Sequence, residues 1–165
     1  MQRRIRWILC GIILSASVYA GRVMATPPKG FTSTTIALGR FDEIDVHNKT
    51  LPAVFWQSRQ KTKGLSDLYV QSNVWAPGGS TGWHTHPGHS LITVTSGTIT
   101  VYEGEDGSCT PRAYTAGMGL VDAGGDHVHI IRNEEQVEAR TITVQLIPAA
   151  AARRIDVPAP GNCPS

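Results

Sequence analysis

The sequence contains little that would support long helices or a nucleic-acid surface. Only 7% of its 165 residues are aromatic and 17% are charged, and no segment keeps a helical hydrophobic period over three or more turns. Fifteen Lys and Arg residues stand against thirteen Asp and Glu residues, but four of the basic residues precede residue 26: Arg3, Arg4, Arg6 and Arg22. The remainder has eleven basic and thirteen acidic residues, a net charge of −2. We therefore expect no nucleic-acid partner.

A hydrophobic run long enough to cross a bilayer is also missing. The longest apolar stretch, Trp7 to Ala20, has fourteen residues, whereas a membrane-spanning helix needs about 20. Because basic residues precede this stretch, residues 1–25 are predicted to form a secretory signal peptide, cleaved after Ala25 or, as the second choice, after Ala20. An uncleaved anchor is the alternative interpretation. The mature protein is expected to be secreted or periplasmic, with no membrane contact after cleavage.

Cysteine is scarce, with three residues in the chain. Cys10 lies inside the predicted signal peptide, which leaves Cys109 and Cys163 as an even pair in an exported protein. Such a pair is most simply a disulfide, and it would tie the C-terminal tail to the body of the domain. Neither cysteine has a Cys-x-x-Cys spacing, which disfavours metal binding by thiolates.

The chain is rich instead in turn residues, seventeen Gly and ten Pro, which separate short apolar or alternating runs. From residue 65 onwards this pattern is typical of a sandwich or barrel, so an all-β fold is predicted. The expected organisation is N-terminal strands over 26–64, a barrel core over 65–148 with a turn at 77–82, and a C-terminal strap over 149–165. The expected strands cover residues 36–46, 51–56, 68–76, 91–95, 98–102, 112–115, 120–121, 127–131 and 137–147.

Histidines are concentrated in one part of the chain, since five of the six lie between residues 84 and 129. His84 and His86 are two residues apart, so on a strand their side chains point to the same face. His127 and His129 repeat that spacing about forty residues later. A closed β-structure can bring two such strands together, and three imidazoles on one ion leave positions open for water, oxygen or substrate. The pattern therefore predicts a metal site of the catalytic type.

These histidines lie in two motifs that resemble those of the cupin superfamily. Gly78, five residues, His84-Thr85-His86-Pro87-Gly88 and then Gly97 are similar to the first cupin motif, in which Gly, His-x-His, Glu and Gly follow one another at set spacings. The segment from Gly124 to Asn133, with His129 three residues before Asn133, is similar to the second motif. The likeness covers about 56 residues, and the strand pattern extends it to most of the mature chain.

The resemblance implies a small antiparallel β-barrel of jelly-roll type, built from two facing sheets and holding a divalent metal. The transferable ligands are His84, His86 and His129, and the expected ion is Fe²⁺, Mn²⁺ or Zn²⁺. Ser90 stands where the family has its Glu ligand, so the usual carboxylate is missing. His89 would replace it only if the backbone bulged, and counting from the Gly124-Gly125 turn makes His127 an alternative to His129.

Two functions of different classes remain open on the sequence alone. The first is an exported metalloenzyme, similar to cupin dioxygenases, that acts on a small molecule. The second is a non-catalytic module that binds a small ligand in the barrel mouth, which the loss of the carboxylate at Ser90 favours. Gln145 either faces inward as a polar contact for that molecule or outward to solvent. Because cupins often pair through their outer sheets, the resemblance also allows a homodimer.

Overall fold

A computed structural model describes residues 24–50 and 56–163. Every regular element within these residues is a β-strand, which confirms the all-β prediction. None of the described residues forms a helix long and apolar enough to span a membrane. The strands are β1 (Lys29–Phe41), β2 (Asp45–Lys49), β3 (Gln57–Lys61), β4 (Ser66–Ser80), β5 (His84–Thr85), β6 (Ser90–Ser96), β7 (Thr98–Glu103), β8 (Arg112–Thr115), β9 (Gly119–Asp122), β10 (His129–Arg132), β11 (Ala139–Pro148) and β12 (Ile155–Asp156).

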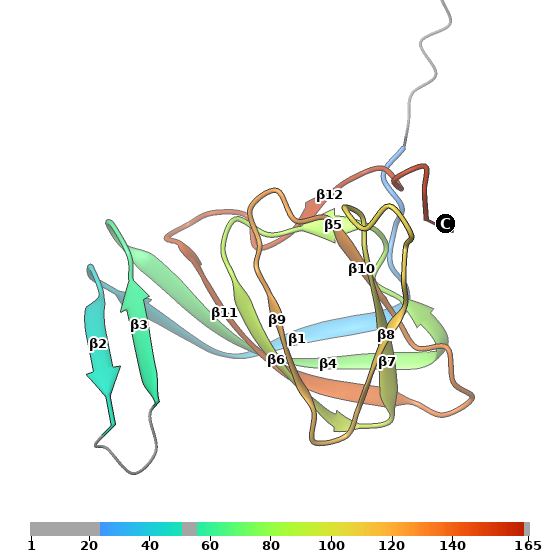
Figure 1. Ribbon diagram of the computed structural model, residues 1–165, viewed down its shortest axis with the longest axis horizontal. Coiled ribbons are helices and arrows are strands. Elements are labelled where there is room, and N and C mark those ends of the chain that lie inside the picture. The colour runs from blue at the N-terminus through green and yellow to red at the C-terminus, as the bar shows by residue number, and fades with distance from the viewer. Residues whose placement is uncertain (1–23, 51–55, 164–165) are drawn as a thin grey trace, which may run out of the picture.

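The strands form a nearly closed antiparallel barrel with two facing walls (Figure 1). One wall follows the pairing order β1, β4, β11, β6, β9, and the other follows β12, β5, β10, β7, β8. Strand β10 joins the walls where Arg132 pairs with Ser80 at the end of β4. On the opposite side of the barrel β8 pairs with β7 and β9 pairs with β6. No pairing in the described sheet joins β8 to β9, so the barrel is open between these two strands.

Alternation along the strands explains which side chains fill the barrel. In β6 the residues at positions 90, 92 and 94 are buried while those at 91, 93 and 95 are exposed, as a strand with one wet face requires. Gly97 makes the hairpin to β7 with a φ of 71°, and a Cβ there would lie 2.6 Å from the carbonyl oxygen of Glu138. The hairpin therefore needs glycine for its backbone conformation and for a close approach to the neighbouring chain.

The hydrophobic core occupies one end of the barrel and leaves the other end to polar residues. Trp75 is at its centre, and the ring of Phe31 from β1 packs 4.8 Å from it, centroid to centroid. Toward the opposite end the inward positions become Asn73, Gln71, Thr143 and Gln145, which are buried and polar. The core cluster comprises Trp75, Ile92, Val94, Ile99, Val101, Ile131 and Ala139.

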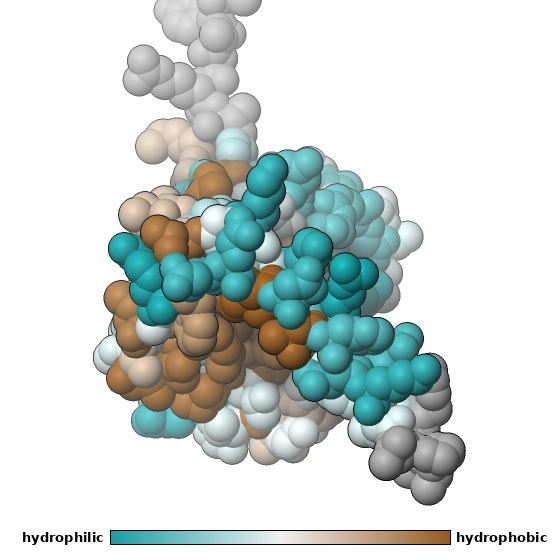
Figure 2. Space-filling view, turned by 90° about the vertical axis from the view of Figure 1, so that its left-hand side faces the viewer, coloured by the Kyte–Doolittle hydropathy of each residue, from teal (hydrophilic) through white to brown (hydrophobic). Residues whose placement is uncertain are grey.

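The N-terminal strands differ from the expected ones in two respects. Strand β1 begins at Lys29 and pairs with β4 along its whole length, so it is part of the barrel wall. The predicted strand 36–46 is interrupted after Phe41, and β2 then pairs with β3 in a separate hairpin. This hairpin is almost entirely polar. Figure 2 views the molecule from the side that carries the hairpin, and it shows hydrophilic residues over the upper and right-hand parts of this face and hydrophobic residues at the lower left.

The predicted turn at 77–82 is wrong in its first half, because β4 continues through Pro77 to Ser80. Gly79 allows this: a Cβ there would lie 2.6 Å from the carbonyl oxygen of Gly30, so only glycine permits the pairing with β1. The turn follows at residues 81–83, where Gly82 has a φ of 69°. Residues 51–55 of the predicted strand at 51–56, and nearly all of the predicted signal peptide, lie outside the described residues.

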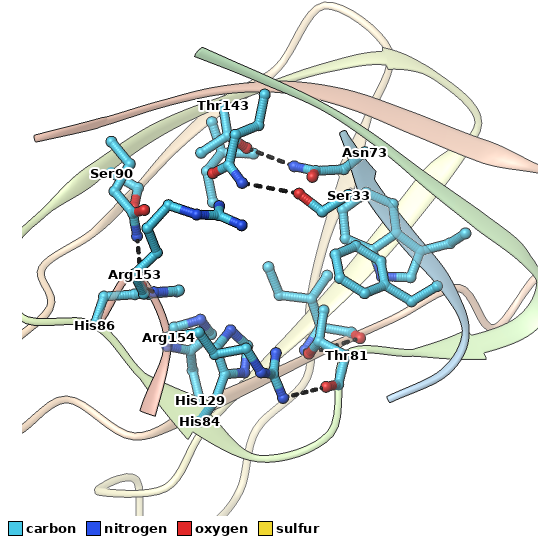
Figure 3. A pocket seen from close by; sticks show the side chains of 16 residues that line it. Ser33, Asn73, Thr81, His84, His86, Ser90, His129, Thr143, Arg153 and Arg154 are labelled. Atoms are coloured by element: carbon cyan, nitrogen blue, oxygen red, sulfur yellow. Dashed lines mark hydrogen bonds between the residues drawn. The ribbon is translucent and has the colours of Figure 1, made fainter. Parts of the chain in front are cut away.

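The C-terminal segment crosses one end of the barrel and is held there covalently. The predicted disulfide between Cys109 and Cys163 is confirmed, with the two Cα atoms 5.4 Å apart. Strand β12 pairs with β5, so Ile155 and Asp156 lie beside Thr85 and His84. We call residues 149–163 the strap. Its course brings Arg153 and Arg154 over the polar end of the barrel (Figure 3).

Candidate metal centre

Three histidines meet at the polar end of the barrel. His84 lies on β5 and is in direct register with His129 on β10, and His86 follows β5 by one residue. The ring centroids are 4.4 Å apart for His84 and His129, 4.8 Å for His84 and His86, and 5.5 Å for His86 and His129. The structure therefore brings together the three residues that the resemblance nominated.

Backbone carbonyl groups orient these rings. The Nδ1 atom of His84 is 2.9 Å from the carbonyl oxygen of Gly82, and the Nδ1 atom of His86 is 2.5 Å from that of Arg153. An Nδ1–H group that donates to a carbonyl leaves the lone pair of Nε2 free for an ion, which is how ligand histidines are commonly held. The ring of His129 hydrogen-bonds to the backbone of His127. The strap thus helps to orient a candidate ligand.

The rings of His84 and His129 are uncharged at neutral pH. Burial lowers the pKa of His84 far below its usual value, and the neighbouring His129 and Arg154 lower it further. Burial also lowers the pKa of His129 to about 4, against the opposite effect of the Asp122 carboxylate. Metals bind the neutral form of imidazole, so these two ligands do not have to lose a proton first.

The donor set fits a divalent transition metal. One potential ligand atom from each histidine lies within 4.8 Å of the other two. An ion with bonds of about 2.1 Å holds its ligand atoms about 3–4 Å apart, so a small inward movement of the rings completes the shell. Imidazole nitrogen is a ligand of Zn²⁺, Fe²⁺ and Mn²⁺ sites alike. Three protein ligands would leave positions for a further ligand and for a substrate.

A cavity of about 90 Å³ opens beside the histidines. Figure 3 shows that β4, β6, β10 and β11 contribute its walls and that the strap lies at its mouth. Gln145 faces inward and is fully buried, and its Nε2 atom donates to the carbonyl oxygen of Arg153. Among the described residues, Oε1 of Gln145 and Oδ1 of Asn73 have no hydrogen-bond partner. Both oxygens are buried, and both residues line the cavity.

Two guanidinium groups border the same cavity. Arg153 lies over the ring of Tyr69, 5.2 Å from its centroid, and its side chain extends into the cavity in Figure 3. Arg154 donates to the carbonyl oxygen of Thr81 over 2.6 Å and pairs with Asp156. Sequence reasoning missed both residues, because only the fold of the strap brings them to the histidines. Their presence makes the cavity favourable for an anion.

The other candidate ligands lie elsewhere. His127 has a half-exposed side chain and pairs with Glu105 over 2.7 Å. His89 lines a different cavity, next to β3 and the end of β11. Ser90 is buried in the wall of the histidine cavity, and its Oγ atom is 3.3 Å from Oδ2 of Asp122. Sequence reasoning also missed Asp122, since the predicted strand at 120–121 stopped one residue short of it.

Comparison with known proteins finds a family match for the middle of the chain. Residues 74–145 match the family model described as the cupin domain, and these residues contain both motifs and all three histidines. Over these residues the chain matches a cupin domain. No curated protein matches the sequence.

Solved structures show how far the fold extends. The polyketide cyclase RemF from Streptomyces resistomycificus superposes with a TM-score of 0.52 over 98% of this chain and 91% of its own, at 14% identity. An oxalate oxidase has a TM-score of 0.42 and 22% identity, over 50% of this chain and 46% of its own. The chain thus spans about half the length of that oxidase. The match to RemF shows that the described part of the chain shares its fold.

Proposed function

We propose that the protein is a metal-dependent enzyme that acts on a small molecule in the barrel cavity. The observation that carries this proposal is the convergence of three imidazoles, two of them buried, with backbone carbonyls at the Nδ1 atoms of His84 and His86. His84, His86 and His129 would hold Fe²⁺, Mn²⁺ or Zn²⁺. A bound ion of this kind supplies Lewis acidity or activates oxygen.

The residues around the cavity support a small anionic substrate. Arg153 and Arg154 place positive charge at the mouth, and guanidinium groups bind carboxylates through two parallel hydrogen bonds. The oxygens of Asn73 and Gln145, which have no hydrogen-bond partner among the described residues, can each accept a hydrogen bond from a hydroxyl or amide of the same molecule. A volume of about 90 Å³ suits a compact molecule. Small keto or hydroxy acids combine these properties.

Metal content is the first test. The protein from residue 26 onwards, purified without added metal and then loaded, should contain one divalent ion per chain, and His84→Ala and His129→Ala should lose it. His127→Ala is the matched control, since that side chain lies at the surface with Glu105. If the parent held much less than one ion per chain, and His84→Ala and His129→Ala held the same amount, the proposal would be refuted.

Turnover is the second test. The loaded protein should consume oxygen or transform a member of a panel of keto acids, phenols and thiols, with preference for the acids. Arg153→Gln should raise KM for the acids more than for the phenols. Saturable binding of an acid without turnover would instead support the alternative function, a non-catalytic module that captures small ligands. The arginine-bordered cavity is the observation that favours this alternative.

We also propose that the protein is exported and that it forms a homodimer. The disulfide between Cys109 and Cys163 is compatible with an oxidising compartment, and N-terminal sequencing of the exported protein should begin at Thr26. Leu91 and Val121, paired across β6 and β9, expose their side chains on the outer sheet. Light scattering should report a dimer, and Leu91→Glu should give a monomer.

A further inference from the structure

A buried carboxylate lies beside the histidines although the family's Glu is absent. Asp122, at the end of β9, is the cross-strand partner of Ser90 on β6. Residues in direct register share a face of the sheet, with Cβ atoms about 5 Å apart, so Asp122 points to the same interior as Ser90. Its Oδ2 atom is 3.4 Å from Nε2 of His86 and its Oδ1 atom is 3.7 Å from Nδ1 of His129.

We propose that Asp122 is the fourth protein ligand of the metal, so that the carboxylate has moved from position 90 to the neighbouring strand. This inference rests on the proposed function. The Nε2 atom of His86 is the free one, because Nδ1 is engaged with the carbonyl group of Arg153. Two ligand atoms that share an ion lie about 3.0–3.4 Å apart at tetrahedral or octahedral angles. The separation of Oδ2 and Nε2 matches that spacing.

The side chain of Asp122 is held for this role by two donors. The backbone N–H of Gly124 donates to Oδ1 over 3.0 Å, and the Oγ–H of Ser90 donates to Oδ2 over 3.3 Å. Ligand carboxylates typically have such outer partners, which fix their orientation. Ser90 stands where the family has its Glu ligand. It therefore orients Asp122, the carboxylate that takes the place of that Glu in this proposal.

The loop that follows Asp122 is fastened to the segment that carries His86. The N–H of Gly125 donates to the carbonyl oxygen of His86 over 2.6 Å, and the hydroxyl of Thr85 donates to the carbonyl oxygen of Gly125 over 2.6 Å. Gly124 has a φ of 67°, and a Cβ there would lie 2.2 Å from the carbonyl oxygen of Gly88. This close backbone packing keeps the carboxylate and the imidazole at one fixed separation.

The decisive experiment titrates Co²⁺ and Mn²⁺ into the metal-free full-length mature protein and its variants, with affinity and the visible spectrum of bound Co²⁺ as readouts. Asp122→Asn should weaken binding by more than about 100-fold and change the Co²⁺ spectrum, whereas loss of an outer partner costs about 10–100-fold. The Asn oxygen can still accept from Gly124, so the fold should persist, and circular dichroism of the metal-free variant checks this.

A carboxylate swap provides the positive test. In Ser90→Glu/Asp122→Ser the carboxylate returns to β6, and this double variant should regain most of the affinity that Asp122→Ser loses. A residue that only oriented His129 would not be replaceable from position 90. Glu103→Gln is the matched control, because it removes a half-buried carboxylate from a second cavity that Asp122 also lines, and it should bind metal as the parent does.

The outcomes separate the two proposals. Parent-like affinity and spectrum in Asp122→Asn, together with metal loss in His84→Ala, would overturn the role of Asp122 and leave the metal site standing. A loss within about 100-fold with an unchanged Co²⁺ spectrum would also overturn it, since Asp122 would then act only as an outer partner. A parent that binds neither ion would overturn both proposals.

Discussion

Asp67 is the most buried carboxylate of the barrel wall, with 2% of its surface exposed. The guanidinium of Arg40 donates to both of its oxygens, over 2.7 and 2.9 Å, and the N–H of Ala150 donates to Oδ2. Chiefly through the bond to Arg40, these contacts lower the pKa of Asp67 from its usual 3.8 to about 2. The side chain thus joins β1, β4 and the start of the strap.

This lowered pKa predicts acid sensitivity. The unfolded chain takes up the proton at higher pH than the folded one, so the contribution of Asp67 is complete above pH 4 and disappears as pH falls toward 2. Asp67→Asn should lower the urea midpoint at pH 6 and flatten its decline between pH 4 and 2. If the urea midpoints of variant and parent declined equally between pH 4 and 2, the carboxylate of Asp67 would not contribute this stability.

Ala150 has a left-handed backbone, with a φ of 62°. For a residue with a Cβ that conformation costs about 1–2 kcal/mol, and glycine avoids the cost. Ala150→Gly should therefore raise the free energy of unfolding by up to about 1 kcal/mol, after the greater entropy of glycine in the unfolded chain is subtracted. Ala151→Gly, at a position without positive φ, should lower it, and urea unfolding compares the two.

At the level of elements, Asn133 connects β4, β10 and β11. It is 1% exposed, and its Nδ2 group lies within hydrogen-bond distance of the carbonyl oxygens of Trp75, Ala76 and Val137. Its place in the second cupin motif thus has a structural reason. It holds β10, and with it His129, against the end of β4.

Removal of this side chain should be costly. Asn133→Ala leaves buried carbonyl oxygens without their donor and should lower the free energy of unfolding by about 3 kcal/mol. Asn162→Ala removes a similar donor, which serves the carbonyls of Gly104 and Asp106 at the surface, and should cost less than about 1 kcal/mol. Equal losses in chemical denaturation would show that burial does not set the cost.

Strands were predictable where local pattern and pairing agree. The run at 112–115 coincides with β8, and the alternating runs at 91–95 and 98–102 lie within β6 and β7. Pro77 and the glycines that follow looked like a turn because their local preference opposes a strand. Tertiary pairing with β1 outweighed that preference, since a glycine backbone was needed beside Gly30.

The candidate site was predictable only in its histidines. Their spacing and the flanking motif glycines carry the information locally, so His84, His86 and His129 could be found without coordinates. Asp122 depends on the register of β6 with β9, which no local pattern specifies. The position of Arg153 beside the histidines depends on the path of the strap, which is held by pairing with β5 and by a disulfide. Contacts of that kind are properties of the folded chain.

For the molecule as a whole, the disulfide holds the strap to the barrel across a sequence separation of 54 residues. Closing a loop of that size stabilises a protein by about 4 kcal/mol in the chain-entropy model. Reduction, or the double variant Cys109→Ser/Cys163→Ser, should lower the free energy of unfolding by up to that amount. It should also weaken metal binding, because His86 loses a fixed acceptor in Arg153.

Cys163→Ser alone, compared with the double variant, controls for a free thiol. Unchanged metal affinity after reduction would show that the strap keeps its place without the covalent link.

The path of the strap also fixes when the centre can mature. The acceptor for His86, the two arginines and Cys163 all follow the last histidine in the sequence, so they are synthesised after every histidine of the centre. A nascent chain that already contains every histidine still lacks the groups that orient one ligand and cover the opening. A metal centre of the proposed kind would therefore be complete only once the strap is in place and its disulfide has formed.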